Sequence, residues 1–178
     1  LSNRSHSRTL GHDLAVRMNY SSKIWDISAG ISIQPEQRSI DQKTGLLQAD
    51  TTMRTLGFQP SLMAIWKYKE KSMLRLSYNG NTHQPSLSSL LSLTDNSNPL
   101  NITRGNPNLK STYHQSVRLE AQNTGKGLFA TLDWRNEINS QTYAVIYNQQ
   151  TGGRETYPVN INGNWNTSGM FRYQKRLR

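Results

Sequence analysis

Apolar and polar residues alternate with a period of two along most of the chain. In the first such stretch, Leu14, Val16 and Met18 share one side, while Arg17 and Asn19 share the other. Strict alternation predicts a β-strand whose two faces meet different surroundings. The pattern predicts seven strands, at Asp13–Tyr20, Ile24–Gln34, Thr51–Lys69, Ser72–Asn79, Thr112–Gln122, Leu128–Glu137 with a continuation through Tyr143–Tyr147, and Val159–Tyr173.

The connections between these strands alternate in length. Three are tight polar turns, two are long polar loops, and one of medium length precedes the last strand. The order short, long, short, long, short, medium is typical of a transmembrane β-barrel with tight periplasmic turns and long extracellular loops. In chain order the connections are Ser21–Lys23, Gln34–Ala49, Lys69–Lys71, Asn81–Lys110, Asn123–Lys126 and Asn148–Arg154.

Charged residues avoid the aligned apolar positions of these strands. In a barrel this face meets lipid, where a charge at mid-bilayer costs about 2–4 kcal/mol. A soluble β-sandwich, whose core face also excludes charge, stays open as an alternative. In the barrel interpretation five charged residues face the lumen and pair with one another across neighbouring strands: Arg75, Arg118, Glu120, Asp133 and Arg135.

Aromatic residues gather near the strand ends that meet at the short turns. In a barrel these positions predict an interfacial girdle, since amphipathic rings favour the membrane–water boundary. In a soluble sheet the same rings would belong to a hydrophobic core. The residues concerned are Tyr20, Trp25, Trp66, Tyr68 and Tyr173.

Composition narrows the class further. Only 34% of the 178 residues are hydrophobic, but four Trp, eight Tyr and the regular alternation are not typical of a disordered chain. The net charge is +10, yet the basic residues are spread along the chain rather than clustered, so we do not expect nucleic-acid binding. No cysteine is present, so there is no disulfide or thiolate metal site. No stretch approaches the roughly 18–20 apolar residues of a transmembrane helix, and we see no signal peptide.

The long stretch Asn81–Lys110, together with the strand before it, carries a set of motifs in fixed order. Tyr78 ends the strand; Pro-Ser, a Leu-rich turn, Asp-Asn-Ser-Asn-Pro-Leu and Gly-Asn-Pro-Asn-Leu-Lys follow. With PVNINGNWN at 158–166 and PSLMAIWKYK at 60–69, this order resembles the outer-membrane β-barrel family of TonB-dependent receptors. The resemblance extends from about Leu14 onward. Ser111 departs from it, because the family usually has proline there.

This resemblance implies energy-coupled uptake of a scarce nutrient through a plugged barrel of about 22 strands in the outer membrane of a Gram-negative-type bacterium. Its partners would be membrane lipid, the rest of the barrel and a plug, and a TonB-type protein acting through that plug. We find no plug domain, TonB-box segment or carboxy-terminal aromatic strand end in residues 1–178. Seven strands that begin and end on opposite sides of the membrane cannot close, so we expect a segment of a larger barrel.

The stretch Asn81–Lys110 also contains the candidate ligand-binding residues. The middle of the loop offers polar side chains to a ligand: Asp95, Asn96, Asn98, Asn101 and Arg104. Gly105, Asn106 and Pro107 predict a rigid turn that re-enters a strand. The loop leucines, Leu87, Leu90, Leu91 and Leu93, are expected to pack the loop against the barrel rim.

Catalytic and metal-binding patterns are weak. His6, His12, His83 and His114 are scattered without a metal-ligand spacing such as HExxH, and GxSxG is absent. The loop also lacks the bidentate glutamate of a calcium loop. On its predicted strand, His114 would be a hydrogen-bonding residue of the lumen. We therefore predict neither an enzyme nor a cofactor.

The sequence thus predicts an all-β fold, an antiparallel up-and-down meander of about seven strands forming part of a transmembrane β-barrel over residues 1–178. The predicted function is ligand capture and uptake. The alternative is a soluble or surface-exposed all-β binding module. Carbohydrate, siderophore, peptide and cobalamin all remain open as ligands.

Overall fold

A computed structural model describes residues 3–44, 47–90, 94–95 and 98–175. Within these residues there are twelve strands and one short helix, α1 (Leu87–Leu90). Eight strands form the main sheet: β1 (Asn3–Gly11), β2 (Leu14–Ser21), β3 (Trp25–Thr44), β4 (Leu47–Lys69), β5 (Ser72–His83), β8 (Thr112–Asn123), β9 (Leu128–Ile138) and β12 (Asn164–Tyr173). Four form a smaller sheet: β6 (Thr94–Asp95), β7 (Asn101–Arg104), β10 (Ser140–Tyr147) and β11 (Arg154–Ile161).

The main sheet is an antiparallel meander in the order β1–β3–β4–β5–β8–β9–β12, with β2 also pairing with β3. β1 pairs with residues 36–44 of β3, and β2 pairs with residues 26–33 of the same strand. β1 and β2 therefore lie end to end beside β3 and together occupy one strand position in the sheet. The sheet therefore has about seven strand positions, as the sequence predicted. It is open: within the described residues, β12 does not pair with β1 or β2.

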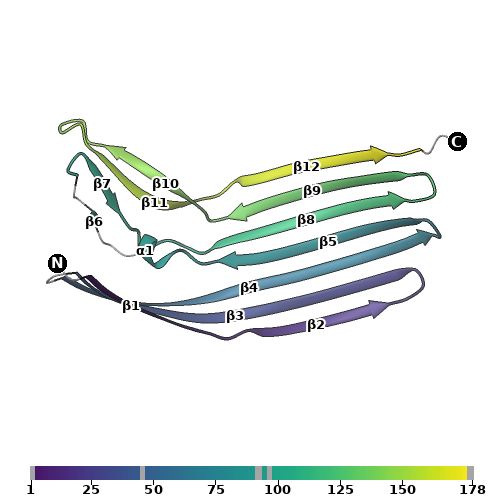
Figure 1. The fold of residues 1–178 in the computed structure, drawn as a ribbon, viewed down its shortest axis with the longest axis horizontal. Coiled ribbons are helices and arrows are strands. Elements are labelled where there is room, and N and C mark those ends of the chain that lie inside the picture. The colour runs from purple at the N-terminus through teal and green to yellow at the C-terminus, as the bar shows by residue number, and fades with distance from the viewer. Residues whose placement is uncertain (1–2, 45–46, 91–93, 96–97, 176–178) are drawn as a thin grey trace.

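The three predicted tight turns lie at one end of the sheet (Figure 1). The turns after β2, β4 and β8 are found there, together with the end of β12. The smaller sheet, α1 and β1 lie at the opposite end. This arrangement confirms the three predicted tight turns at one end of the sheet, and the long connection between β5 and β8 at the other.

The prediction of a loop at Gln34–Ala49 is wrong. β3 and β4, which are 20 and 23 residues long, pair residue by residue from Trp25 opposite Trp66 to Thr44 opposite Leu47. Residues 3–11, which the sequence pattern did not assign to a strand, form β1 and pair with the outer part of β3. Polar residues can make this ladder because its backbone hydrogen bonds do not require an apolar face. In the sequence, polar residues fall at both odd and even positions here, so the alternation that revealed the other strands is lost.

The last predicted strand is also divided. Asn139, with φ 55°, ends β9, and Gly163, with φ 91°, precedes β12. Such left-handed backbone conformations are tolerated by Asn and favoured by Gly. Between the two kinks, β10 and β11 leave the main sheet and join β7 and β6. The predicted continuation through Tyr143–Tyr147 is a strand, but it belongs to the smaller sheet.

The register keeps the two predicted faces of the main sheet intact. Leu62, Tyr78, Val117 and Trp134 are successive neighbours on one face. The neighbouring residues on the same strands point to the other face. There Met63, Ser77, Arg118 and Asp133 form the next row, which is mostly polar.

The apolar face has no covering layer. Val16 is 72% exposed and Phe171 71%, and within the described residues the buried hydrophobic side chains apart from proline are Leu90 and Leu109. Both lie in the long connection between β5 and β8 rather than under the sheet. A β-sandwich would bury this face against a second sheet. The soluble alternative is therefore not supported.

The predicted aromatic girdle lies at the short-turn end. Trp25 and Trp66 stack there, with ring centroids 5.8 Å apart and planes 9° apart, and Tyr68 contacts Trp66 at 5.4 Å. The sequence analysis missed a second group at the other end, where Phe58 and Tyr113 lie 6.3 Å apart. From residue 58 to residue 66 of β4 the strand rises about 26 Å. Because strands of outer-membrane barrels tilt by about 35–45°, this length covers about 20 Å of an apolar band that is about 25 Å tall.

No helix among the described residues is both long enough and apolar enough to span a membrane.

Candidate ligand-binding surfaces

Charged side chains on the polar face pair across neighbouring strands. Arg118 Nε lies 2.6 Å from Asp133 Oδ1, and Arg75 Nη1 lies 3.7 Å from Glu120 Oε1. The cross-strand pairing predicted for these four residues is confirmed. The fifth, Arg135, lies on the same face opposite Ser116 and has no ion pair within the described residues. Partly exposed pairs of this kind contribute little stability, about 0–1 kcal/mol each. Their main effect is to neutralise charge on this face.

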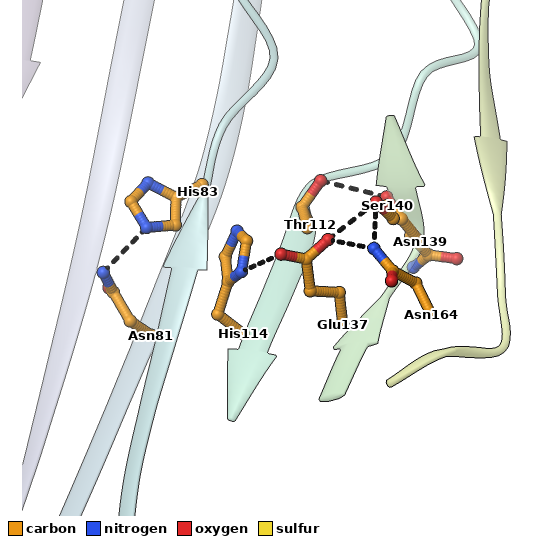
Figure 2. A network of polar contacts seen from close by, with 8 residues as sticks. All are labelled: Asn81, His83, Thr112, His114, Glu137, Asn139, Ser140 and Asn164. Carbon is orange, nitrogen blue, oxygen red and sulfur yellow. Dashed lines mark hydrogen bonds and ion pairs between the residues drawn. The ribbon is translucent and has the colours of Figure 1, made fainter. Parts of the chain in front are cut away.

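A polar network lies where the main sheet meets the long connections (Figure 2). Its centre is Glu137: its Oε1 lies 3.0 Å from His114 Nδ1, and its Oε2 accepts hydrogen bonds of 2.7 Å from both Ser140 Oγ and Asn164 Nδ2. Since these residues come from β8, β9, β10 and β12, the carboxylate ties the junction of the two sheets together. His114 is thus a hydrogen-bonding residue, as predicted.

His83 joins this network through the register of β5 and β8. Its ring meets the His114 ring edge to face, with centroids 4.7 Å apart, and its Nε2 lies 3.1 Å from Asn81 Nδ2. This proximity could not be predicted from the sequence, because the two histidines are 31 positions apart and belong to no motif. Among the described residues, no group of three or more His, Cys, Asp or Glu is suited to hold a metal ion.

A shallow hollow of about 260 Å³ adjoins the network on the polar face. Arg135 borders it and is exposed to solvent. The other polar side chains around the hollow are Asn79, Asn81, His114, Ser116 and Glu137. This surface can donate and accept hydrogen bonds, but it contains no nucleophile and base arranged for catalysis.

The smaller sheet contains the predicted loop residues. Asn101 and Arg104 lie on β7, and Asp95 lies on β6 opposite Thr103. Asn98 forms a turn in which its Oδ1 accepts a 3.0 Å hydrogen bond from the Leu100 backbone. Asn96 lies outside the described residues.

Two of these side chains are engaged within the protein. Arg104 forms an ion pair with Glu155 and lies 4.6 Å from the centroid of the Tyr157 ring. Asn101 Oδ1 accepts a 2.9 Å hydrogen bond from Arg154 Nε. Both contacts connect β7 to β11, which pair in parallel. The structure therefore shows a role in joining two connections; ligand binding by these residues stays a prediction.

The turn at Gly105–Pro107 has a second role that the sequence analysis missed. Asn106 Oδ1 accepts a 3.0 Å hydrogen bond from the Asn108 backbone, as expected of a turn. Its Nδ2 also donates a 2.9 Å hydrogen bond to the Pro158 carbonyl, 52 positions away. The two motif segments, 105–110 and 158–166, thus bind each other directly.

Packing of the loop leucines is confirmed in part. Leu90 is 6% exposed and Leu87 is half-buried, close to the fully buried Pro85. Leu91 and Leu93 lie outside what the structure describes.

The sequence profile of the outer membrane protein β-barrel family matches residues 12–178. The chain belongs to this family. Membership assigns it to the outer membrane, where the apolar face of the sheet meets lipid.

A solved structure with a similar fold is that of the siderophore receptor PirA from Pseudomonas aeruginosa. The two chains share 14% sequence identity with a TM-score of 0.56, and the match covers 93% of this chain and 40% of PirA. The chain therefore spans less than half of that receptor's length, and at this identity the likeness shows the fold alone. A search of curated proteins found no match.

Proposed function

We propose that this chain is the barrel segment of an outer-membrane receptor that captures a nutrient and passes it inward by TonB-dependent uptake, without a chemical step. Family membership and the fold that it shares with a siderophore receptor support this proposal. The rest of the barrel, a plug and an energy-coupling protein would be its partners. The polar face would line the path of the ligand.

One observation carries the proposal: the two connections at the end opposite the short turns form one ordered structure. β7, from the first connection, pairs in parallel with β11, from the second, and Asn106 bonds to Pro158. A surface that is already ordered loses less conformational entropy when a ligand binds. A passive pore would not need its external connections joined in this way.

The proposed ligand contacts lie on this joined structure. Asn98 is exposed, and Arg104 is exposed despite its ion pair. With Asp95, Asn96 and Asn101 they would make the first contact from outside. Below them, the hollow beside Arg135 and the paired charges of the polar face would contact a ligand on its way inward.

The test uses cells that lack the gene and carry either the full-length protein or a variant with residues 94–104 replaced by a Gly-Ser linker. Depletion of single components from a defined medium is measured, with candidate carbohydrates, ferric chelates, peptides and cobalamin present together. We expect one component to be depleted only with the unmodified protein, and not after the proton gradient of the inner membrane is dissipated. Depletion that persists without the gradient would mean a passive pore and would refute energy-coupled uptake.

A further inference from the structure

Five lysines lie at the short-turn end of the main sheet. They come from separate parts of the sequence, and the meander brings their turns to the same end (Figure 1). All five are exposed. We call them the basic edge: Lys23, Lys69, Lys71, Lys126 and Lys175.

The charge of the basic edge is not neutralised by the chain itself. Within the described residues none of these lysines has an ion pair, and the one acidic residue in segments 21–24, 69–72, 123–127 and 174–175 is Glu70. At the opposite end of the molecule Arg38 pairs with Glu36 and Arg104 with Glu155, although Arg8, Arg54 and Lys110 have no ion pair within the described residues. A row of unneutralised lysines favours an anionic partner.

The aromatic girdle fixes the depth of the basic edge in the membrane. Lys69 directly follows Tyr68, and Lys175 lies two residues after Tyr173. Tryptophan and tyrosine rings of a girdle lie at the level of the lipid head groups. Lysines one to three residues beyond them, within about 10 Å along the chain, reach the same level.

The surface at this end is hollowed beside the lysines. One hollow of about 570 Å³ is bordered by Lys23, Tyr68, Lys69 and Lys71. Another, of about 740 Å³, is bordered by Lys126, Tyr173 and Lys175. Each one combines ammonium groups with an aromatic ring, which suits a phosphate group attached to an acyl glycerol.

We propose that the basic edge binds the phosphate groups of anionic phospholipids in the periplasmic leaflet of the outer membrane. Short turns of bacterial barrels face the periplasm, and basic residues near an anionic membrane surface are attracted to it. The lysines follow the line of the turns, just beyond the girdle, rather than collecting in one patch. This distribution fits a membrane surface better than an acidic protein. The inference depends on the family and the topology, and is independent of which nutrient is taken up.

The experiment measures which lipid stays bound to the full-length protein. The protein in neutral detergent is equilibrated with equal amounts of phosphatidylglycerol and phosphatidylcholine and re-isolated, and the bound lipids are quantified by mass spectrometry. We expect phosphatidylglycerol to be enriched roughly threefold or more, and the enrichment to disappear in 1 M salt, where the Debye length is about 3 Å.

Variants decide whether the basic edge is responsible. The triple variant Lys69→Gln, Lys71→Gln and Lys126→Gln should bind the two lipids about equally, whereas the same three lysines changed to Arg should keep the preference. The matched control removes three exposed charges at the opposite end and should also keep it: Arg8→Gln, Arg54→Gln and Lys110→Gln. Each variant is also checked for correct folding: a folded variant should resist unfolding in cold detergent, as the unmodified protein does. Equal binding of the two lipids by the unmodified protein, or an equal loss in the control, would refute the proposal.

Discussion

The side-chain amide of Asn160 makes a reciprocal pair of hydrogen bonds with the backbone of Lys110. The Lys110 N–H donates to Asn160 Oδ1 at 2.7 Å, and Asn160 Nδ2 donates to the Lys110 carbonyl at 3.1 Å. The same Nδ2 donates to the Asn139 carbonyl at 2.8 Å. The amide therefore imitates a neighbouring strand at the point where the two external connections leave the main sheet.

Changing Asn160 to Asp should loosen this junction. A carboxylate can still accept from the Lys110 N–H, but it has no donor for the carbonyls of Lys110 and Asn139 and would repel them. Loss of such partly buried hydrogen bonds costs about 1–3 kcal/mol. Hydrogen exchange should accelerate in residues 101–110 and 154–161, while exchange in β4 and β5 should stay the same. Asn166→Asp, an exposed position on β12, is the control, and similar exchange in both variants would contradict this role of Asn160.

Substitutions at Leu62 and Met63 test which face of the main sheet meets lipid. The two residues are adjacent on β4, and their exposures are nearly equal, 36% and 38%, but they lie on opposite faces of the sheet. Leu62→Arg would put a charge near the middle of the apolar band and should cost about 2–4 kcal/mol, whereas Met63→Arg should be tolerated. Assembly into outer membranes, followed by heat-dependent gel mobility, measures both. If the two variants assemble equally well, our assignment of the lipid face is wrong.

Substitutions of Arg104 and Glu155 test whether Arg104, a predicted ligand-binding residue, has only a structural role. If their ion pair only joins β7 to β11, Arg104→Gln and Glu155→Gln should have similar effects on loop stability, and the double variant should be no worse than either. For an exposed pair we expect a coupling free energy of about 0.2–1 kcal/mol. Thermal unfolding of the four proteins gives this value. A larger loss of nutrient uptake in Arg104→Gln than in Glu155→Gln would instead indicate contact with ligand.

Glu137 holds the junction of the two sheets through both carboxylate oxygens. Glu137→Gln replaces one acceptor oxygen by an NH₂ group, so either His114 or the pair Ser140 and Asn164 would lose its acceptor. The expected loss is about 1–3 kcal/mol in the free energy of unfolding. Denaturation in detergent measures it, with Glu70→Gln as the control because Glu70 is exposed in a turn. Equal midpoints for the two variants would show that the network does not stabilise the junction.

The site was predictable only in part. The alternation placed Arg75, Arg118, Glu120 and Asp133 on one face, and pairing across strands followed from that. The sequence also identified the segments 105–110 and 158–166 as motifs, but not that they bind each other. Asn101 and Arg104 looked like free polar residues, because nothing in the sequence gives the parallel pairing of β7 with β11 that engages them.

The sequence by itself determined the membrane-spanning strands, their two faces and the three tight turns that join them. It could do so because side chains of a strand point to opposite faces in turn, and lipid on one side imposes a strict apolar pattern. Tertiary structure alone decided the long hairpin of β3 and β4 beyond the membrane, where polar residues at both odd and even positions leave no pattern. It also decided which distant residues became neighbours, such as His83 with His114, and it gathered lysines that are spread along the chain into one basic edge. Those relationships depend on strand register and on hydrogen bonds between residues up to 53 positions apart, which no local pattern encodes.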